Sequence, residues 1–533
     1  MKATRFAMRA ILAMAVAVAC ALTVACGAGP TTPPAPIVAV SKSQNPLVAN
    51  VTVMTSCAGQ AMVEFGEDTT YGRTTSWYPV SGNFLQSSIL VAGMKASTLY
   101  HMRAQLNCGG AQTPSQDMTF TTGPLPALAF PTVTVSRPNS ALSTSENPGI
   151  ESVDITIADT PAFFTDRDGN PIWYYDNGKG QFAFPFKMLA NGHMLLNVTG
   201  FIGEGGSTLT EVDLAGNVVR SLNIFTLQHE MATIGGFDLV PQGFHHDFVE
   251  LPNGHIIALV DCNKNFTNLS GYPGTTQVVG DGLVDLDQNW NPVWAWNSFD
   301  YVGNGLDINR HLGGLPDWTH GNAILYSPED GNLLFSMRQQ SWVVKIDYNN
   351  GGGTGNILWH LGYQGDFALT VGGVPTDDPS QWFSFQHFPI ILSQNGSETT
   401  LGIWDNGNDR VLNAAGAQCI NPLAGTAFPS CYSRPLIFQV DESSMVANIA
   451  WADQLPYFGI FGGNINQFSN GNVEFDLNDP AIPPSPSVAS QVQEITTTGT
   501  PQVVWQMNIT PGGEFAYRAL RVPSLYNGVT WLH

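Results

Sequence analysis

The sequence predicts an all-β protein in which a small β-sandwich precedes a six-bladed β-propeller. The chain contains 55 Gly and 35 Pro among 533 residues, and only 12% of its residues are charged, which is typical of a turn-rich β protein. From residue 150 to 533 no helical period is sustained. A strand unit recurs six times there, and six four-stranded units predict a ring-shaped propeller. Five units end in a Trp that we expect to pack between sheets: Trp173, Trp294, Trp359, Trp451 and Trp505.

The N-terminus has the pattern of an export signal. Basic residues precede an apolar run at 10–25, which is short and ends in small residues, so 1–26 is predicted to be a signal peptide rather than a membrane span. Residues 22–26 resemble a bacterial lipobox. Cleavage there would leave a lipid on Cys26 and tether the protein to a membrane surface, whereas ordinary cleavage nearby is the alternative. The Pro-rich stretch 27–40 is predicted to be a flexible tether.

Residues 41–123 predict a separate small domain. Short alternating strands occur at 51–54, 61–65 and 99–105, and their phrasing resembles a fibronectin-type or Ig-like β-sandwich. Such modules mostly act as spacers or packing units, so we expect no catalysis here.

Cysteine usage fits an oxidising compartment outside the cytoplasm. Cys57 and Cys108 flank the small domain, and Cys419 and Cys431 close a local loop, so both pairs are predicted disulfides. Cys262 lies in a mostly apolar strand, where we expect a buried and inert thiol. The sequence therefore predicts an exported protein, periplasmic or on the cell surface, held by its lipid anchor.

The charge balance restricts the partners. The formal net charge is −22, which argues against binding to nucleic acid because few cations would neutralise phosphates. Such acidity is typical of a soluble protein outside the cell. An anionic substrate would need a local cationic pocket.

Three histidines lie at the same point of the strand unit. His245 and His387 each stand eight residues before an Asn-Gly turn, and His320 stands ten before an Asp-Gly turn. Equivalent positions of symmetric blades converge on the axis, so these imidazoles predict a central site for nucleophilic or acid–base chemistry, or for a metal. Strand alternation directs His246 to the other face and favours a structural role for it, although the sequence leaves open which of His245 and His246 turns inward.

Seven further sequence motifs surround these histidines: Phe244–Asp247, Asp317–Asn322, Leu333–Ser341, Val344–Asp347, Gln386–His387, Trp404–Arg410 and Tyr432–Arg434. Together they resemble the bacterial arylsulfate sulfotransferase (arylsulfotransferase) family, and the resemblance covers most of 150–533. It implies an exported six-bladed propeller with a small N-terminal β-sandwich, which transfers sulfuryl groups between phenols through a sulfated histidine and without the nucleotide donor PAPS.

The resemblance also implies roles for single residues. His387 is the nucleophile of a ping-pong reaction, and His245 and His320 bind the sulfuryl group or act as acid–base catalysts. Arg338 offers a permanent charge and a planar fork to the sulfuryl oxygens. Asn322 adds an amide donor, on the same face as His320 if the strand alternates regularly. The expected partners are a phenolic sulfate donor and a phenolic acceptor, no cofactor or metal is expected, and a homodimer is allowed.

Three polar residues of the motifs remain ambiguous. Asp247 either orients an imidazole or hydrogen-bonds a turn. Arg410 and Arg434 are either anion ligands or partners in inter-blade salt bridges, and the salt bridges are favoured.

Two other classes of function stay open. A metal-dependent propeller hydrolase or lyase would use the three histidines as ligands, as in open zinc sites. Arg338 and Asn322 argue against this class, because a cation beside a metal is unfavourable. A propeller that only binds would need no cluster of imidazoles.

Overall fold

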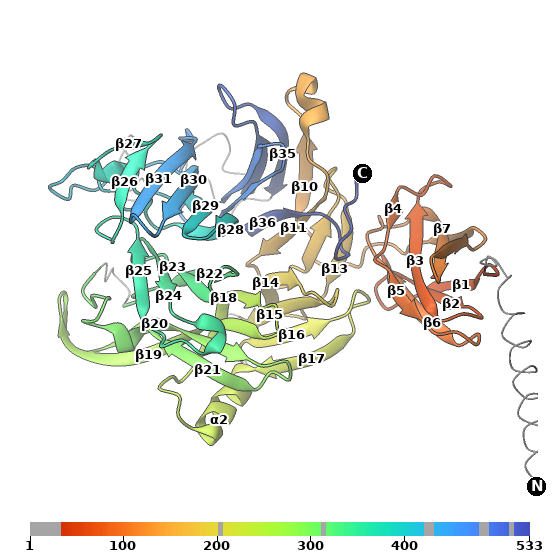
Figure 1. Cartoon of the computed structure of the whole chain (residues 1–533), viewed down its shortest axis with the longest axis horizontal. Helices are drawn as coiled ribbons and strands as arrows, with labels where there is room; N and C mark the ends of the chain where they lie inside the picture. The colour runs from red at the N-terminus through yellow and green to blue at the C-terminus, as the bar shows by residue number, and fades with distance from the viewer. Residues whose placement is uncertain are drawn as a thin grey trace, which may run out of the picture. The chain divides into compact units, whose positions relative to one another are not determined.

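A computed structural model describes residues 33–200, 206–310, 316–419, 431–478, 490–510 and 516–532. The described chain is nearly all β (Figure 1). The predicted signal peptide 1–26, with Cys26 and the first part of the tether, lies outside the described residues. No helix among those described is long and apolar enough to cross a membrane.

One α-helix departs from the predicted absence of helices. Helix α2 (Ile224–Ile234) begins after Asn223, whose side chain accepts a hydrogen bond from the N–H of Phe225. Its buried face is formed by Ile224, Leu227 and Met231. These three positions give a short helical period that is too brief to stand out in the sequence.

The chain divides into two compact units, and the first comprises residues up to Ser41 with Asn50–Ile89 and His101–Phe120. Alternate side chains of its strands are buried, as a two-layer β domain requires. Cys57 and Cys108 form a disulfide in this unit, with their Cα atoms 6.4 Å apart. One sheet contains β1 (Ile37–Lys42), β2 (Ala49–Met54) and β6 (Gln86–Val91), and the other contains β3 (Gly59–Gly66), β4 (Arg73–Thr74), β5 (Tyr78–Val80), β7 (Leu99–Cys108), β8 (Ala111–Pro114) and β9 (Met118–Thr121).

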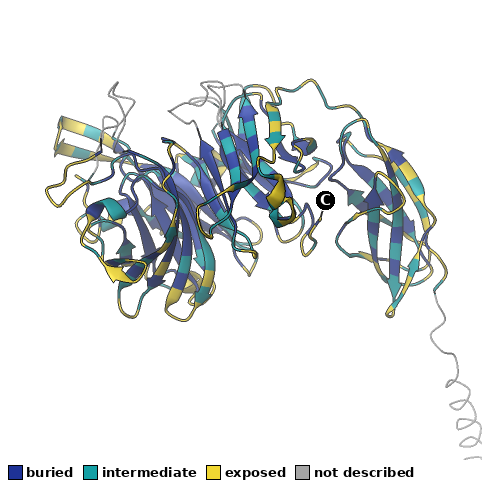
Figure 2. Cartoon of the chain, turned by 90° about the horizontal axis from the view of Figure 1, so that it is seen from above, coloured by how far each residue is buried: buried dark blue, intermediate teal, exposed yellow. Residues whose placement is uncertain are grey.

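The second unit contains six sheets among its described residues. Three of these sheets each consist of four strands that are consecutive in sequence. Figure 2 shows buried residues filling these strands and exposed residues at the turns. The three sheets are β14 (Gln181–Met188), β15 (Met194–Gly200), β16 (Thr208–Val212), β17 (Val218–Asn223); β18 (Gly243–Glu250), β19 (Ile256–Leu269), β20 (Tyr272–Leu286), β21 (Pro292–Asn297); and β22 (Gly321–Ser327), β23 (Asn332–Met337), β24 (Trp342–Ile346), β25 (Ile357–Leu361).

The other three sheets combine consecutive strands with additions from elsewhere. Cys419 and Cys431 form the second disulfide, between β29 and β30. The sheets are β28 (His387–Asn395), β29 (Glu398–Asp405), β30 (Arg434–Asp441), β31 (Val446–Ala452), extended by β26 (Ala368–Val371) and β27 (Val374–Pro375); β32 (Asn464–Gln467), β33 (Val473–Asn478), β34 (Ser490–Ile495), β35 (Val503–Thr510), extended by β10 (Thr132–Ser136); and β11 (Ile150–Ile155), β12 (Ala162–Thr165), β13 (Pro171–Tyr175), extended by β36 (Ala516–Val522).

At each end of the unit, a strand pairs with a strand from the opposite end of the sequence. Strand β10 pairs antiparallel with β35, and β36 pairs antiparallel with β11. The strands β14, β18, β22, β28, β32 and β36 each stand at one end of their sheet, and neighbours in this series from β14 to β36 contact one another. Figure 1 shows β14, β18, β22, β28 and β36 near one another in the middle of the unit.

Tryptophans connect neighbouring sheets, which is the packing role that the sequence predicted. Trp173 and Trp505 are fully buried. Three indole N–H groups donate to backbone carbonyls in turns of the next sheet, whereas the buried Nε1 of Trp359 has no hydrogen-bond partner among the described residues. One of the three, on Trp296, was not among the five predicted tryptophans. The pairs are Trp173 with Leu214, Trp296 with Gly355 and Trp505 with Arg167, each at 2.9 Å.

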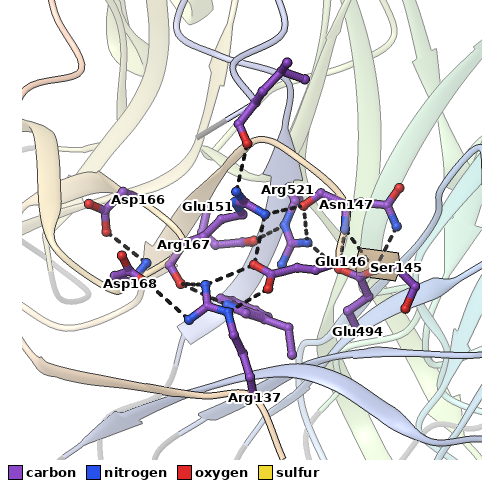
Figure 3. Close-up of polar contacts among 12 residues, drawn as sticks. Arg137, Ser145, Glu146, Asn147, Glu151, Asp166, Arg167, Asp168, Glu494 and Arg521 are labelled. Carbon is purple, nitrogen blue, oxygen red and sulfur yellow. Dashed lines mark hydrogen bonds and ion pairs between the residues drawn. The ribbon is translucent and has the colours of Figure 1, made fainter. Parts of the chain in front are cut away.

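A buried arginine ties the last strand to two sheets. Arg521 on β36 contacts Glu151 on β11 at 2.5 Å, Glu494 on β34 at 2.5 Å and Glu474 on β33 at 3.2 Å. These side chains are at most 1% exposed. Figure 3 shows Arg521 between Glu151 and Glu494, with Asn147 also hydrogen-bonded to Glu494. Burial raises the pKa of Glu474 and Glu151, and Arg521 opposes this effect.

We predict that Arg521→Met lowers stability by about 3–5 kcal/mol, because it leaves buried carboxylates without their cation. Thermal unfolding followed by circular dichroism measures the loss. Removing the cation raises the folded-state pKa of the glutamates further, so the deficit should shrink as pH falls and they become protonated. Arg137→Met is the control, because Arg137 pairs with Glu146 at a more exposed site and should cost about 1 kcal/mol or less. Equal losses from the two variants would contradict a special role for Arg521.

Candidate functional site

The structure brings four histidines together where the inner strands begin. His245 and His246 lie on β18, His320 immediately precedes β22, and His387 is the first residue of β28. The ring centroid of His246 is 4.9 Å from that of His245 and 4.8 Å from that of His320. Tyr517 of β36 connects the group to His387, with ring centroids 5.5 Å from both His246 and His387.

The sequence favoured an outward, structural His246 but left open which of His245 and His246 turns inward, and in the structure His246 contacts both His245 and His320. The ladder between β18 and β19 shifts register between Phe244 and Phe248, and His246 has φ 48°. A bulge of this kind breaks strand alternation, so consecutive side chains reach the same side. The Nδ1 atoms of His245 and His246 are therefore only 2.7 Å apart. His320 also has a positive φ, of 46°, so its relation to Asn322 is not that of a regular strand.

His387 is a buried imidazole held on both nitrogens, and it is 1% exposed. Its Nδ1 lies 2.7 Å from Oδ1 of Asn406, and its Nε2 accepts the N–H of Gly462 at 3.2 Å. Burial and the nearby positive charge of Arg338 hold the pKa of His387 well below its usual value. The ring is therefore neutral at neutral pH and has a lone pair available for nucleophilic attack.

His245 has the opposite electrostatic environment. Its Nε2 lies 3.3 Å from Asp261 and 3.2 Å from Asp281. Burial lowers the pKa of His245, but these carboxylates outweigh burial and raise it to about 9. His245 is therefore cationic at neutral pH, whereas burial and the other imidazoles keep the pKa of His246 well below its usual value. Environments that separate pKa values in this way assign different roles to similar groups.

His320 forms a dyad with a carboxylate. Its Nδ1 lies 2.5 Å from Oδ2 of Asp317. Burial alone would raise the pKa of Asp317, but the hydrogen bond to His320 and the charge of this ring lower it. The carboxylate therefore fixes the orientation of the imidazole and accepts its Nδ1 proton.

Arg338 is a buried cation with donors to spare. It follows β23, is 6% exposed, and donates from Nη2 to the carbonyl of Ile460 at 3.2 Å. Its Nε has no hydrogen-bond partner among the described residues, and its guanidinium lies 4.7 Å from the ring centroid of Phe385. Burial lowers the pKa of Arg338 to about 10, so it stays charged at neutral pH. Its remaining N–H groups suit an anion.

Asn322 contributes to the site in a different way from the predicted one. Its Nδ2 donates to the backbone carbonyl of Gln386 at 2.8 Å, and the side chain is fully buried. Gln386 immediately precedes His387, so this bond holds the start of β28 against β22. The amide thus has a structural partner of its own.

Asp247 contacts no imidazole among the described residues. It pairs with Lys187 at 2.5 Å and with Arg518 at 3.4 Å, and it accepts the backbone N–H of Ile324 at 2.9 Å. The sequence left open whether Asp247 orients an imidazole or hydrogen-bonds a turn. In the structure it accepts a hydrogen bond from the backbone, but from strand β22 rather than from a turn.

Arg410 and Arg434 form salt bridges, but within one sheet rather than between sheets. Both contact the carboxylate of Asp405, at 2.9 Å and 2.8 Å respectively. Asp405 ends β29 and Arg434 begins β30, so the ion pairs fasten the loop that contains Asn406. Cys262 is buried and unpaired, as predicted, and burial raises the pKa of its thiol.

Several residues of the cluster were not predicted from the sequence. Tyr517 is buried and its hydroxyl has no partner among the described residues. It lies on β36, outside the repeated motifs, so no pattern identifies it. Asp261 and Asp281 could have been noticed, because each interrupts an apolar stretch of β19 or β20. Asn406 lies in a motif, but only the structure shows its contact with His387.

A cavity of about 390 Å³ adjoins the paired histidines. Its volume is suited to a small ligand with one or two rings. Its walls combine aromatic and polar residues, and include Phe182, Phe184, Phe244, His245, His246 and Asp261.

One group of side chains could hold a metal ion among the described residues. The ligand atoms of His245, Asp261 and Asp281 lie within 4.8 Å of one another. This set differs from the three-histidine site considered from the sequence, because it contains neither His320 nor His387. One imidazole and two carboxylates suit a divalent transition metal, but they equally suit the imidazolium of His245 without a metal.

Comparisons with known proteins give one strong match. A protein of unknown function from Bacteroides caccae is similar over 74% of this chain and 94% of its own, at 11% identity and a TM-score of 0.32. The WD40 domain of SCAP from fission yeast is similar over 91% and 97%, at 8% identity and a TM-score of 0.25. Both likenesses are too weak to support an argument, and no curated protein matches the sequence. The family model Arylsulfotransferase (ASST) matches residues 140–518, well over half of the chain, and this protein therefore belongs to the arylsulfotransferase family.

Proposed function

We propose that the protein transfers a sulfuryl group from a phenolic sulfate ester to a phenolic acceptor, without PAPS, through a sulfated His387. The observation that supports this best is the pairing of a neutral, buried His387 with a cationic Arg338 that has free donors. A nucleophilic lone pair and an anion-binding group are the two requirements of attack on a sulfate ester. Family membership supports arylsulfotransferase activity in general.

In the first half of the reaction, Nε2 of His387 attacks sulfur. The N–S bond forms as the bond between sulfur and the aryl oxygen breaks, and the electron pair of that bond leaves on the phenolate. Arg338 offers donors to the sulfuryl oxygens, and the N–H of Gly462, which contacts Nε2 before attack, is placed to do the same. The phenolate takes a proton from the cationic side of the cluster, where His245 holds one.

In the second half, the steps reverse with another phenol. The acceptor hydroxyl gives its proton to the deprotonated histidines of the cluster, and its oxygen attacks sulfur. The N–S bond breaks and its electron pair returns to Nε2 of His387. Proton donor and proton acceptor are thus the same group in turn, which suits a ping-pong exchange between two phenols.

The cavity beside His245 and His246 is the proposed binding place for the aryl group. Phe184 and Phe244 provide apolar surface, and ring stacking on them suits a planar phenol. His246 lies between this cavity and His320, so an aryl oxygen bound there faces the proton-carrying histidines.

The architecture and the location are proposals of the same kind. We interpret the six sheets as the blades of a propeller, closed by β36, and the first unit as an Ig-like or fibronectin-like domain. We propose that the protein acts outside the cytoplasm, held through a lipid on Cys26, because two disulfides suit an oxidising compartment.

A metal-dependent hydrolase is the second candidate, based on the group His245, Asp261 and Asp281. Family membership does not favour it. Metal analysis of the purified protein, with activity measured after chelation, separates the two candidates. Stoichiometric metal whose removal abolishes turnover would favour the hydrolase.

We predict that His387→Ala abolishes transfer and leaves the fold intact, because the covalent route is lost. The assay follows p-nitrophenolate release from p-nitrophenyl sulfate with and without phenol, and acceptor-stimulated release identifies transfer. Mass spectrometry of the wild type with donor alone should show sulfuryl on the peptide that contains His387. His193→Ala is the control, because His193 pairs with Glu211 away from the cluster. A label on another residue alone would move the nucleophile.

We predict that Arg338→Lys lowers kcat by roughly 10²-fold, about 3 kcal/mol, and raises KM for the donor. Lysine keeps the charge but loses the planar fork that meets two sulfuryl oxygens. Steady-state kinetics with varied donor measures both effects. Arg220→Lys is the matched control: its Nε donates to Glu211 at 2.6 Å in the sheet β14–β17, which carries none of the four clustered histidines, so it should lower the melting temperature and spare kinetics. The same pattern in Arg338→Lys would make Arg338 structural.

We predict a broad pH optimum whose alkaline side reports His245. Activity that needs protonated His245 falls as pH rises through its pKa of about 9. Asp281→Asn removes one carboxylate that raises this pKa, so the alkaline limb should move to lower pH. The kcat/KM profile with phenyl sulfate measures this, because its phenolate needs a proton on leaving. An unmoved limb would exclude His245 as the titrating acid.

A further inference from the structure

Asn406 is a buried amide whose orientation is fixed by three contacts. It follows β29 and is fully buried. Its Nδ2 donates to the carbonyl of Gly459 at 2.8 Å and to the carbonyl of Gly462 at 3.1 Å. Both N–H groups are thereby used on carbonyls, so the oxygen of the amide must face Nδ1 of His387, 2.7 Å away.

This orientation determines where His387 carries its proton. An amide oxygen only accepts hydrogen bonds, so Nδ1 of His387 must be the donor. Nε2 is then unprotonated, and it accepts the N–H of Gly462 at 3.2 Å. The two contacts on opposite sides of the ring agree on one tautomer.

We propose that Asn406 is a positioning residue, which holds His387 in the Nδ1–H tautomer for attack through Nε2 and keeps the sulfated ring reactive. The proposal rests on the proposed function for its second half. The Nδ1 proton stays on the ring throughout, so neutral imidazole leaves when the N–S bond breaks. A carboxylate at this place would neutralise the positive charge of the sulfated ring and make the intermediate more stable. A neutral amide orients the ring without doing so.

Residue 406 determines whether a neutral amide or a carboxylate contacts Nδ1 of His387. Arg338 and the other imidazoles disfavour a positive charge on His387, and Asn406 is the contact that supports its Nδ1 proton. Replacing this amide by a carboxylate would therefore place an anion in direct contact with the ring. The titratable and charged groups that face His387 are Arg338, His320, His246, Arg518 and Tyr517.

The first test needs no variant at position 406. The full-length protein is labelled with ¹⁵N-histidine, and the resonances of His387 are identified by their absence in His387→Ala. We expect a protonated Nδ1 and an unprotonated Nε2 at neutral pH. A protonated Nε2 would overturn the proposal, whether or not the protein transfers sulfuryl groups.

The second test compares Asn406→Asp with Asn177→Asp. Asn177 is also a buried amide, but it donates to the carbonyl of Thr160 at 2.7 Å and has no contact with His387 or Arg338. Asn406→Asp should move the acid limb of kcat/KM to higher pH by about 1 to 3 units, because a carboxylate raises the pKa of an adjacent imidazole. It should also prolong the lifetime of sulfated His387 after a pulse of p-nitrophenyl sulfate. Asn177→Asp should change neither.

The outcomes separate this proposal from the proposed function. If no sulfated His387 is found in the wild type, the proposed function fails. The ¹⁵N measurement of the His387 tautomer still tests the positioning role of Asn406 in that case. With sulfated His387 present, an unchanged acid limb and lifetime in folded Asn406→Asp would overturn the role of Asn406. Equal shifts in both variants would do the same, because they would reflect an added buried carboxylate rather than the contact with His387.

Discussion

The pairing of β36 with β11 is the constraint on which the rest of the second unit depends. This pairing joins the last described strand to the first strands of the unit, in the register Asp154 with Arg518. It brings Tyr517 against His246 and His387, which belong to strands far apart in the sequence. The buried contacts of Arg521 with three glutamates hold the same strand. The strand pairing that joins the two ends of the unit therefore also places Tyr517 in the histidine cluster.

Burial has different consequences for the histidines because their partners differ. Every imidazole in the cluster loses hydration, which disfavours its charged form. The carboxylates of Asp261 and Asp281 stabilise the cationic form of His245, whereas His387 contacts an amide and is disfavoured as a cation by the positive charge of Arg338. The same residue type is thus cationic at one point of the cluster and neutral at another. Sulfuryl transfer to a phenol needs both states, a proton source and a lone pair.

The sequence predicts the convergence of the histidines but not their contacts. The repeat register places His245, His320 and His387 at equivalent points, because turns and strand lengths are local properties that recur in each unit. The inward turn of His246 depends on a bulge with positive φ at a residue other than Gly, which no pattern of alternation contains. The position of Tyr517 depends on the pairing of β36 with β11, a long-range pairing that leaves no local signal. Helix α2 escapes prediction because its apolar face is only three residues long.

The proposed binding of a sulfate ester is compatible with an acidic chain, because carboxylates near the site are paired with basic groups while one cation has no carboxylate partner in the part of the chain that the structure describes. The net charge of −22 repels an anion at long range, but ionic screening limits that effect to about 10 Å. Several carboxylates near the histidines already have a basic partner: Asp247 has Lys187, Asp281 has His245 and Asp317 has His320. Arg338 has no carboxylate partner at ion-pair distance among the described residues, so its charge is the one left for a ligand. In the proposed reaction, a sulfuryl group held by Arg338 is attacked by His387, whose own contacts are an amide and a backbone N–H. The anion therefore meets a cation and a neutral nucleophile, rather than the acidity of the whole chain.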